Sequence, residues 1–143
     1  LKSVNYYGTV SNDEIRTALT QSHILAYPST YVESSCCVAI EAMAAGLLCV
    51  VPDYGALTET CTDFAWMYPW ESDPAKHAER FAGVLGNAIT NINTPAVQSV
   101  LQLQQTYYNY FFSWDVRAAQ WEDLLIGLLH KHENKPKRIK YPY

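Results

Sequence analysis

The residues of this chain that could do chemistry lie in one short segment, residues 28–46. Glu33 precedes a predicted helix, and Glu41 lies inside it among Ala, Ile and Met residues. The first turn of a helix leaves N–H groups unpaired, and its dipole attracts anions, so a phosphate can bind there without a lysine. The segment thus offers an anion site, one carboxylate beside it and a second carboxylate about two turns further on. This combination suits a nucleotide-sugar.

Glu41 has two interpretations that the spacing leaves open. A carboxylate buried in an apolar helix is costly unless it is paired or hydrogen-bonded. Glu41 could therefore lie on the exposed stripe of the helix, which the spacing alone favours. In the other interpretation it points into a cleft and accepts hydrogen bonds from ligand hydroxyls.

The sequence lacks the residue patterns that other kinds of catalysis require. The serines have no G-x-S-x-G context, and the glycines form neither G-x-G-x-x-G nor a Walker loop. Cys36 and Cys37 have no neighbouring histidine, so we expect them to be structural rather than nucleophilic. The four histidines and four cysteines show no metal-binding spacing, so we expect no metal and no cofactor.

An alternation of strands and helices must position these residues. Apolar runs predict strands at residues 4–7, 23–27, 47–51 and 64–68. Helix signals include the capping box from Ser11 to Glu14, Gly46 at a helix end, and the Ser-Asp-Pro start at residue 72. One predicted helix opens at the capping box and carries Ile15, Ala18 and Leu19 on one face. The other predicted helices span 37–45, 56–61, 72–92, 94–110 and 114–132.

This alternation predicts an α/β fold: a Rossmann-like parallel sheet with flanking helices. Ligands of such sheets bind outside the carboxyl ends of the strands. Those ends include residues 27–33 and 52–57, where the polar residues of interest lie.

Composition and charge exclude other classes of protein. The chain has 143 residues, 49% of them hydrophobic and 17% charged, which excludes a disordered chain. Residues 131–143 carry five basic residues against one Glu, so residues 1–130 hold a net charge of −8 within the total of −4. An acidic body argues against nucleic-acid binding. The basic tail suits a solvated terminus, or else a contact with an anionic membrane surface.

The segment resembles the E-x7-E signature of the retaining nucleotide-sugar glycosyltransferases of family four (glycosyl transferases group one), which have the GT-B architecture. The resemblance covers roughly residues 5–125. It rests on Pro28-Ser29, Glu33, Glu41-Ala42-Met43-Ala44-Ala45-Gly46, the apolar strand that follows, Asp53-Tyr54-Gly55, Glu59 and Ser113-Trp114-Asp115.

The resemblance implies a role for each matching residue. Glu33 matches the catalytic glutamate at the donor sugar, and Glu41 matches the glutamate that binds the ribose hydroxyls. The backbone amides of Ser35, Cys36 and Cys37 match the stretch that contacts the donor sugar and its phosphates. The last matches, in a loop near the same cleft, are Gly55 and Glu59. The family transfers a sugar from a nucleoside-diphosphate donor, with retention of configuration and without a metal.

The resemblance also implies the setting of the chain. We expect residues 1–133 to be the nucleotide-sugar-binding carboxyl-terminal half of a GT-B enzyme, truncated at its start, and residues 134–143 to be a basic extended tail. A missing amino-terminal domain would bind the acceptor, which is a saccharide, a lipid-linked saccharide or a protein. Without it we expect weak or no activity. We expect a cytoplasmic location, with peripheral membrane contact as the alternative role of the tail.

Two other functions remain open. A nucleotide-sugar epimerase can share the GT-B architecture, although the context of the two glutamates disfavours it. A non-catalytic nucleotide-sugar binding module would use the same residues without turnover.

Overall fold

The computed structural model describes residues 4–133, and their side chains as far as residue 130. The chain divides into two compact units, Leu1–Asn109 and Tyr110–Tyr143. A single nucleotide-sugar-binding domain over residues 1–133 stays a prediction, and the predicted tail at 134–143 lies outside the described residues.

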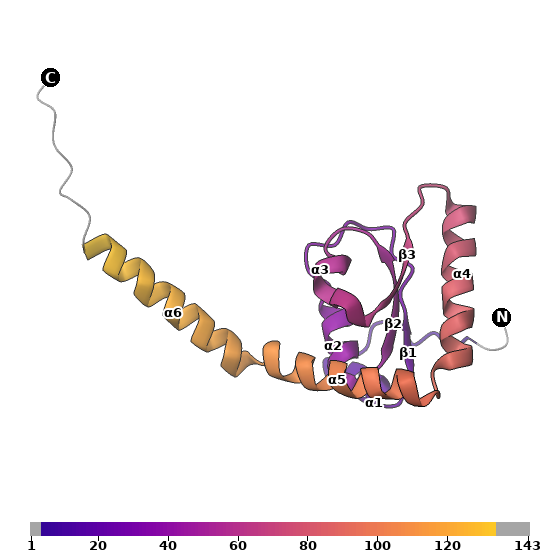
Figure 1. Ribbon diagram of the computed structural model, residues 1–143, viewed down its shortest axis with the longest axis horizontal. Coiled ribbons are helices and arrows are strands. Elements are labelled where there is room, and N and C mark those ends of the chain that lie inside the picture. Colours follow the sequence, from indigo (N-terminus) through magenta and orange to yellow (C-terminus); the bar gives the residue numbers. More distant parts are fainter. Residues whose placement is uncertain (1–3, 134–143) are drawn as a thin grey trace, which may run out of the picture. The chain divides into compact units, whose positions relative to one another are not determined.

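A parallel sheet is the centre of the first unit (Figure 1). Its strands are β1 (Ile24–Ala26), β2 (Leu48–Asp53) and β3 (Trp66–Pro69), in the order β1-β2-β3. Leu25 aligns with Cys49, and Val51 aligns with Met67. All three strands run the same way, so their carboxyl ends share one edge of the sheet.

Helices cover both faces of this sheet (Figure 1). The crossover helices α2 (Cys37–Ala45) and α3 (Leu57–Cys61) lie on one face, and α4 (Pro74–Asn91) lies on the other. The strand order β1-β2-β3 moves across the sheet in one direction. Right-handed connections between such parallel strands place their helices on the same face of the sheet. Helix α1 (Asn12–Thr20) precedes β1, a short 3₁₀ helix η1 (Thr62–Phe64) precedes β3, and α5 (Pro95–Phe111) follows α4. The predicted α/β class is confirmed.

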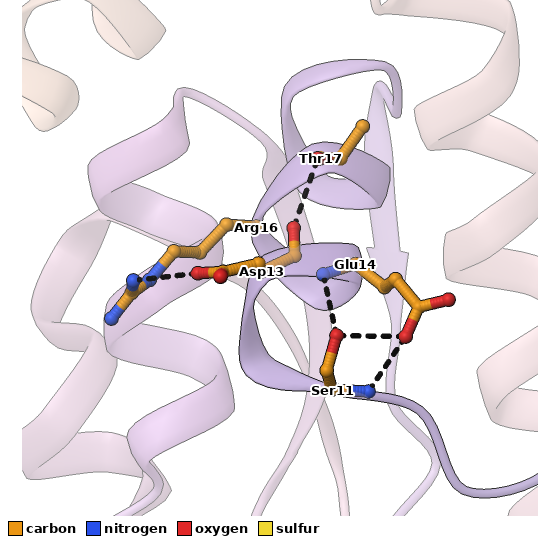
Figure 2. Close-up of polar contacts among 5 residues, drawn as sticks. All are labelled: Ser11, Asp13, Glu14, Arg16 and Thr17. Carbon is orange, nitrogen blue, oxygen red and sulfur yellow. Dashed lines mark hydrogen bonds and ion pairs between the residues drawn. The ribbon is translucent and has the colours of Figure 1, made fainter.

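Local signals in the sequence set the helix ends. At α1 the Ser11 hydroxyl accepts a hydrogen bond from the Glu14 N–H, and the Glu14 carboxylate accepts from the Ser11 N–H at 2.9 Å (Figure 2). The Ser11 N–H and hydroxyl hydrogen bonds lower the pKa of the exposed Glu14. Asp73 caps α4 by accepting from two backbone amides. Gly46 ends α2 in the left-handed region, at φ +90°.

The core lies on both sides of β2, whose first five residues are buried. Because side chains alternate along a strand, Leu48 and Val50 face one side and Cys49 and Val51 the other. On the first side the buried cluster is completed by Tyr68, Ala88, Ile92 and Leu101. On the other side α2 and α3 pack against β2. The continuous apolar run therefore forms the fully buried strand that it predicts.

The predicted strand at residues 4–7 is wrong. This segment is not a strand, and Val4, Tyr6 and Tyr7 are exposed. A strand needs a hydrogen-bonded neighbour. Within the described residues the sheet has three strands, and none of them pairs with this segment.

The second unit contains α6 (Trp114–Glu133), which Ser113 caps by accepting from the Val116 N–H at 3.3 Å. The helix exposes apolar side chains, namely Trp114, Trp121, Leu124, Leu125, Ile126, Leu128 and Leu129. Within the part of the chain that the structure describes, no helix is both long enough and apolar enough to cross a membrane.

Candidate functional site

The side chain of Glu33, in the loop after β1, is held by a hydrogen bond from within the same loop. The Tyr27 hydroxyl, at the carboxyl end of β1, donates a hydrogen bond of 2.6 Å to the Glu33 carboxylate. This bond and burial raise the pKa of Tyr27 to about 12, so the hydroxyl stays protonated as a donor.

The backbone of Glu33 is held by the loop after β2. The Ala56 N–H donates to the Glu33 carbonyl oxygen at 2.9 Å. Gly55 lies at φ +59°, and a Cβ placed there would be 2.9 Å from the Glu33 nitrogen. Only glycine fits this close approach without strain. Gly55 therefore lies directly against the backbone of Glu33, while the membership of both residues in one donor site stays a prediction.

Helix α2 begins directly after the loop that follows β1 and carries Glu33. Cys36 is the N-cap residue, with an extended backbone, and its side chain makes no capping hydrogen bond. The Ala39 N–H of the first turn still faces the Cys36 thiol closely enough to act on its pKa, whereas, among the described residues, the amides of residues 35–38 donate to no backbone carbonyl. Such amides, with the helix dipole behind them, form a binding site for an anion.

The buried thiols near this helix end are not activated. Cys36 is 3% exposed, and burial raises its pKa. Burial also raises the pKa of Cys61 to about 12. Cys37 is exposed, and all four cysteines are free. The buried Cys36 thiol cannot face a ligand in solution, so a contact from this residue would come from its backbone.

The other predicted site residues lie on exposed surfaces. Glu41 is exposed on α2, one turn after Cys37 and on the same face. Ser35 is exposed in the loop before the helix. Glu59 is exposed on the short helix α3. Within the described residues, no hydrogen bond or ion pair engages the carboxylates of Glu41 and Glu59, which leaves both available to a ligand.

Positive charge is scarce around the site in the described residues. Arg16 forms an exposed ion pair with Asp13 at 3.3 Å (Figure 2). Arg80, on α4, pairs with Glu71 at 2.6 Å. Among the described residues, no group of three His, Cys, Asp or Glu side chains is arranged so that it could hold a metal ion.

Aromatic residues at the carboxyl edge of the sheet were missed by the sequence analysis. Tyr27 is the first, and its place just after a strand and before Pro28 was the available signal. Tyr54 follows β2 and stacks on Trp70, which follows β3, with ring centroids 4.4 Å apart. These rings tie together the loops that follow two neighbouring strands.

A hollow of about 560 Å³ lies elsewhere, beside α1. Its lining includes Tyr7, Ile15 and Leu19, and neither Glu33 nor Glu41 belongs to it. The candidate site is therefore distinct from this hollow.

Comparison with known families identifies one family for this chain. The family model for glycosyl transferases group 1 matches residues 1–92 of the 143-residue chain. The chain belongs to the glycosyl transferases group 1 family. No curated protein and no solved structure gave a significant match.

Family membership makes this protein a glycosyltransferase with a Rossmann-like α/β fold. A glycosyltransferase of this family implies a nucleotide-sugar donor and an acceptor. The matched region ends at the carboxyl end of α4 and contains every predicted site residue, from Glu33 to Glu59.

Proposed function

We propose that this glycosyltransferase chain binds a nucleoside-diphosphate sugar and transfers the sugar to an acceptor hydroxyl with retention of configuration. In this proposal Glu33 lies at the donor sugar and Glu41 binds the ribose hydroxyls. The amides of Ser35, Cys36 and Cys37 receive the diphosphate, and Gly55 and Glu59 border the same cleft.

The observation that carries the proposal is the helix start beside a fixed carboxylate. Glu33 is held by Tyr27 through its side chain and by Ala56 through its backbone. Directly after it, α2 begins with no side-chain cap from Cys36. A diphosphate at that helix end would place its sugar and ribose within reach of carboxylates on either side.

The chemistry then depends on orientation and on stabilising the leaving diphosphate. The bond between the anomeric carbon and the diphosphate oxygen breaks, and the acceptor oxygen bonds to that carbon on the same face. A donor phosphate oxygen takes the acceptor proton. The backbone amides and the α2 dipole stabilise the negative charge that develops on the diphosphate, and the proposal needs no metal.

The proposal includes a second half that binds the acceptor. In the GT-B architecture the active site lies between two Rossmann-like halves, and this chain would be the carboxyl-terminal one. The half-buried Glu33, beside the exposed Ser34 and Ser35, fits a site that another domain completes. The acceptor would be a saccharide, a lipid-linked saccharide or a protein, and the reaction would take place in the cytoplasm.

Titration of the nucleotide tests the ribose assignment. Glu41→Ala should weaken binding of uridine, guanosine or adenosine diphosphate about tenfold or more, because a carboxylate that accepts ribose hydroxyls is lost. The control is Glu79→Ala, which removes another exposed helical glutamate, on α4. Equal affinity for all the nucleotides in Glu41→Ala and the unchanged chain would remove Glu41 from the site.

Product analysis with a panel of nucleotide sugars and acceptors separates the alternatives. Released nucleotide with a glycosylated product supports transfer, and Glu33→Gln should then lower turnover. Inversion of the free donor would favour an epimerase. Binding without turnover, in the full-length protein, would favour a binding module.

A further inference from the structure

We infer that Tyr27 is a positioning residue for the glycosyl transfer: its hydroxyl fixes the Glu33 carboxylate at the sugar end of the donor site. The inference rests on the proposed function, because it assumes that Glu33 acts at the donor sugar. It adds a residue that neither the sequence pattern nor the family match assigns.

The first support is the rigidity of Tyr27 itself. Tyr27 is the residue directly after β1, and its N–H donates to the Val50 carbonyl oxygen of β2 at 3.0 Å. Val50 is fully buried in the central strand. The Tyr27 carbonyl oxygen accepts from the Ser29 N–H at 2.9 Å. The backbone of Tyr27 is therefore held by the sheet and by the turn that follows.

The second support is the way Glu33 is held. Its backbone is fixed to the β2–α3 loop by the bond from Ala56, and Gly55 packs against it. A fixed backbone still leaves a glutamate side chain with several rotamers. The 2.6 Å bond from Tyr27 selects one of them. A side chain held by a neighbour at the right place loses less freedom when the substrate binds.

The third support is chemical. A phenol donates one hydrogen bond and leaves the second carboxylate oxygen of Glu33 free for a ligand. The raised pKa of Tyr27, about 12, keeps the hydroxyl a donor at neutral and mildly alkaline pH. Glu33 is half-buried, so part of the residue remains in contact with solvent.

Tyr27→Phe tests the inference, since it removes the hydroxyl and keeps the ring. With the donor that the full-length enzyme uses, we expect kcat to fall roughly ten- to a hundredfold, because a hydrogen bond to a charged group is lost. KM for the donor and Kd for the free nucleoside diphosphate should stay within about twofold, since the phosphate and ribose contacts are made elsewhere. The loss should be the same between pH 7 and pH 9.

Two variants accompany it. Tyr31→Phe removes a hydroxyl from the same loop. Because Tyr31 is 72% exposed, this variant should leave kcat unchanged. Glu33→Gln tests the function on which the inference rests. If Glu33→Gln lowers kcat and Tyr27→Phe does not, the positioning role is wrong and the proposed function stands.

Other outcomes also decide the matter. If Glu33→Gln leaves kcat unchanged, the assigned role of Glu33 fails, and the role of Tyr27 fails with it. If Tyr27→Phe lowers the midpoint of thermal unfolding and raises the donor KM together with the fall in kcat, Tyr27 supports the fold and the inference is overturned.

Discussion

Gly55 shows how a single residue sets the geometry of the site. It combines a left-handed backbone, at φ +59°, with backbone atoms of Glu33 at 2.9 and 3.0 Å from the place of a Cβ. A side chain there would meet backbone atoms, which cannot rotate away. Two loops from different strands can therefore touch only because this residue is glycine.

Gly55→Ala should destabilise the fold by about 1–3 kcal/mol, through left-handed strain and the clash with Glu33. The measurement is the free energy of unfolding in urea. Gly83→Ala is the matched control, because Gly83 lies inside α4 with nothing within 4 Å of its Cβ position. That variant should gain about 0.5–1 kcal/mol. Equal stability of Gly55→Ala and the unchanged chain would contradict the packing described.

At the scale of residues, the sequence shows which side chains are present and how they are spaced, but it does not show which atoms they contact. The spacing of Glu33 and Glu41 on a loop and an apolar helix is visible in the sequence. The bond from Tyr27 to Glu33 is not, because it depends on the path of the intervening loop. The sequence also could not decide the position of Glu41, which the structure shows exposed on α2.

At the scale of elements, α5 holds the carboxyl end of α2. The side-chain amide of Gln104, on α5, donates to the carbonyl oxygens of Met43 and Leu47 at 3.2 and 2.9 Å. Asn109 donates to the Ala44 carbonyl oxygen at 2.9 Å. The last carbonyls of a helix need such partners when they are buried. Thus α5, which lies after the matched region, completes a helix of the candidate site.

Gln104→Leu should cost about 1–2 kcal/mol of unfolding free energy, because two buried carbonyls lose a donor. Part of the loss is offset, since the Oε1 atom of Gln104 is buried without a partner among the described residues. Chemical denaturation measures the change. Gln102→Leu, on the exposed side of α5, should stay within about 0.5 kcal/mol. A Gln104 variant as stable as the Gln102 variant would rule out this support.

Most elements could be predicted because their signals are local. The capping box at Ser11, the glycine after Ala45 and the Asp-Pro start of α4 each end or begin a helix in the structure. The segment at residues 4–7 was predicted wrongly because apolar residues do not make a strand by themselves. Pairing with a neighbour far along the chain decides that, and no local pattern records it.

At the scale of the whole molecule, an acidic chain is proposed to bind an anion. The net charge is −4, and the described arginines on α1 and α4 pair with carboxylates. Attraction for a diphosphate would therefore come from the backbone amides and dipole of α2. The proposed function therefore depends on that helix end being a site for the donor.

The most direct measurement is a backbone amide NMR titration of the chain with UDP-glucose, GDP-mannose and ADP-glucose. The account predicts that at least one donor gives saturable shifts, with the largest at the amides of residues 35–39 and smaller ones at Glu41. The affinity should fall in Glu41→Ala. Shifts concentrated along the hollow beside α1, or no shift at residues 35–39 with any donor, would contradict the central claim.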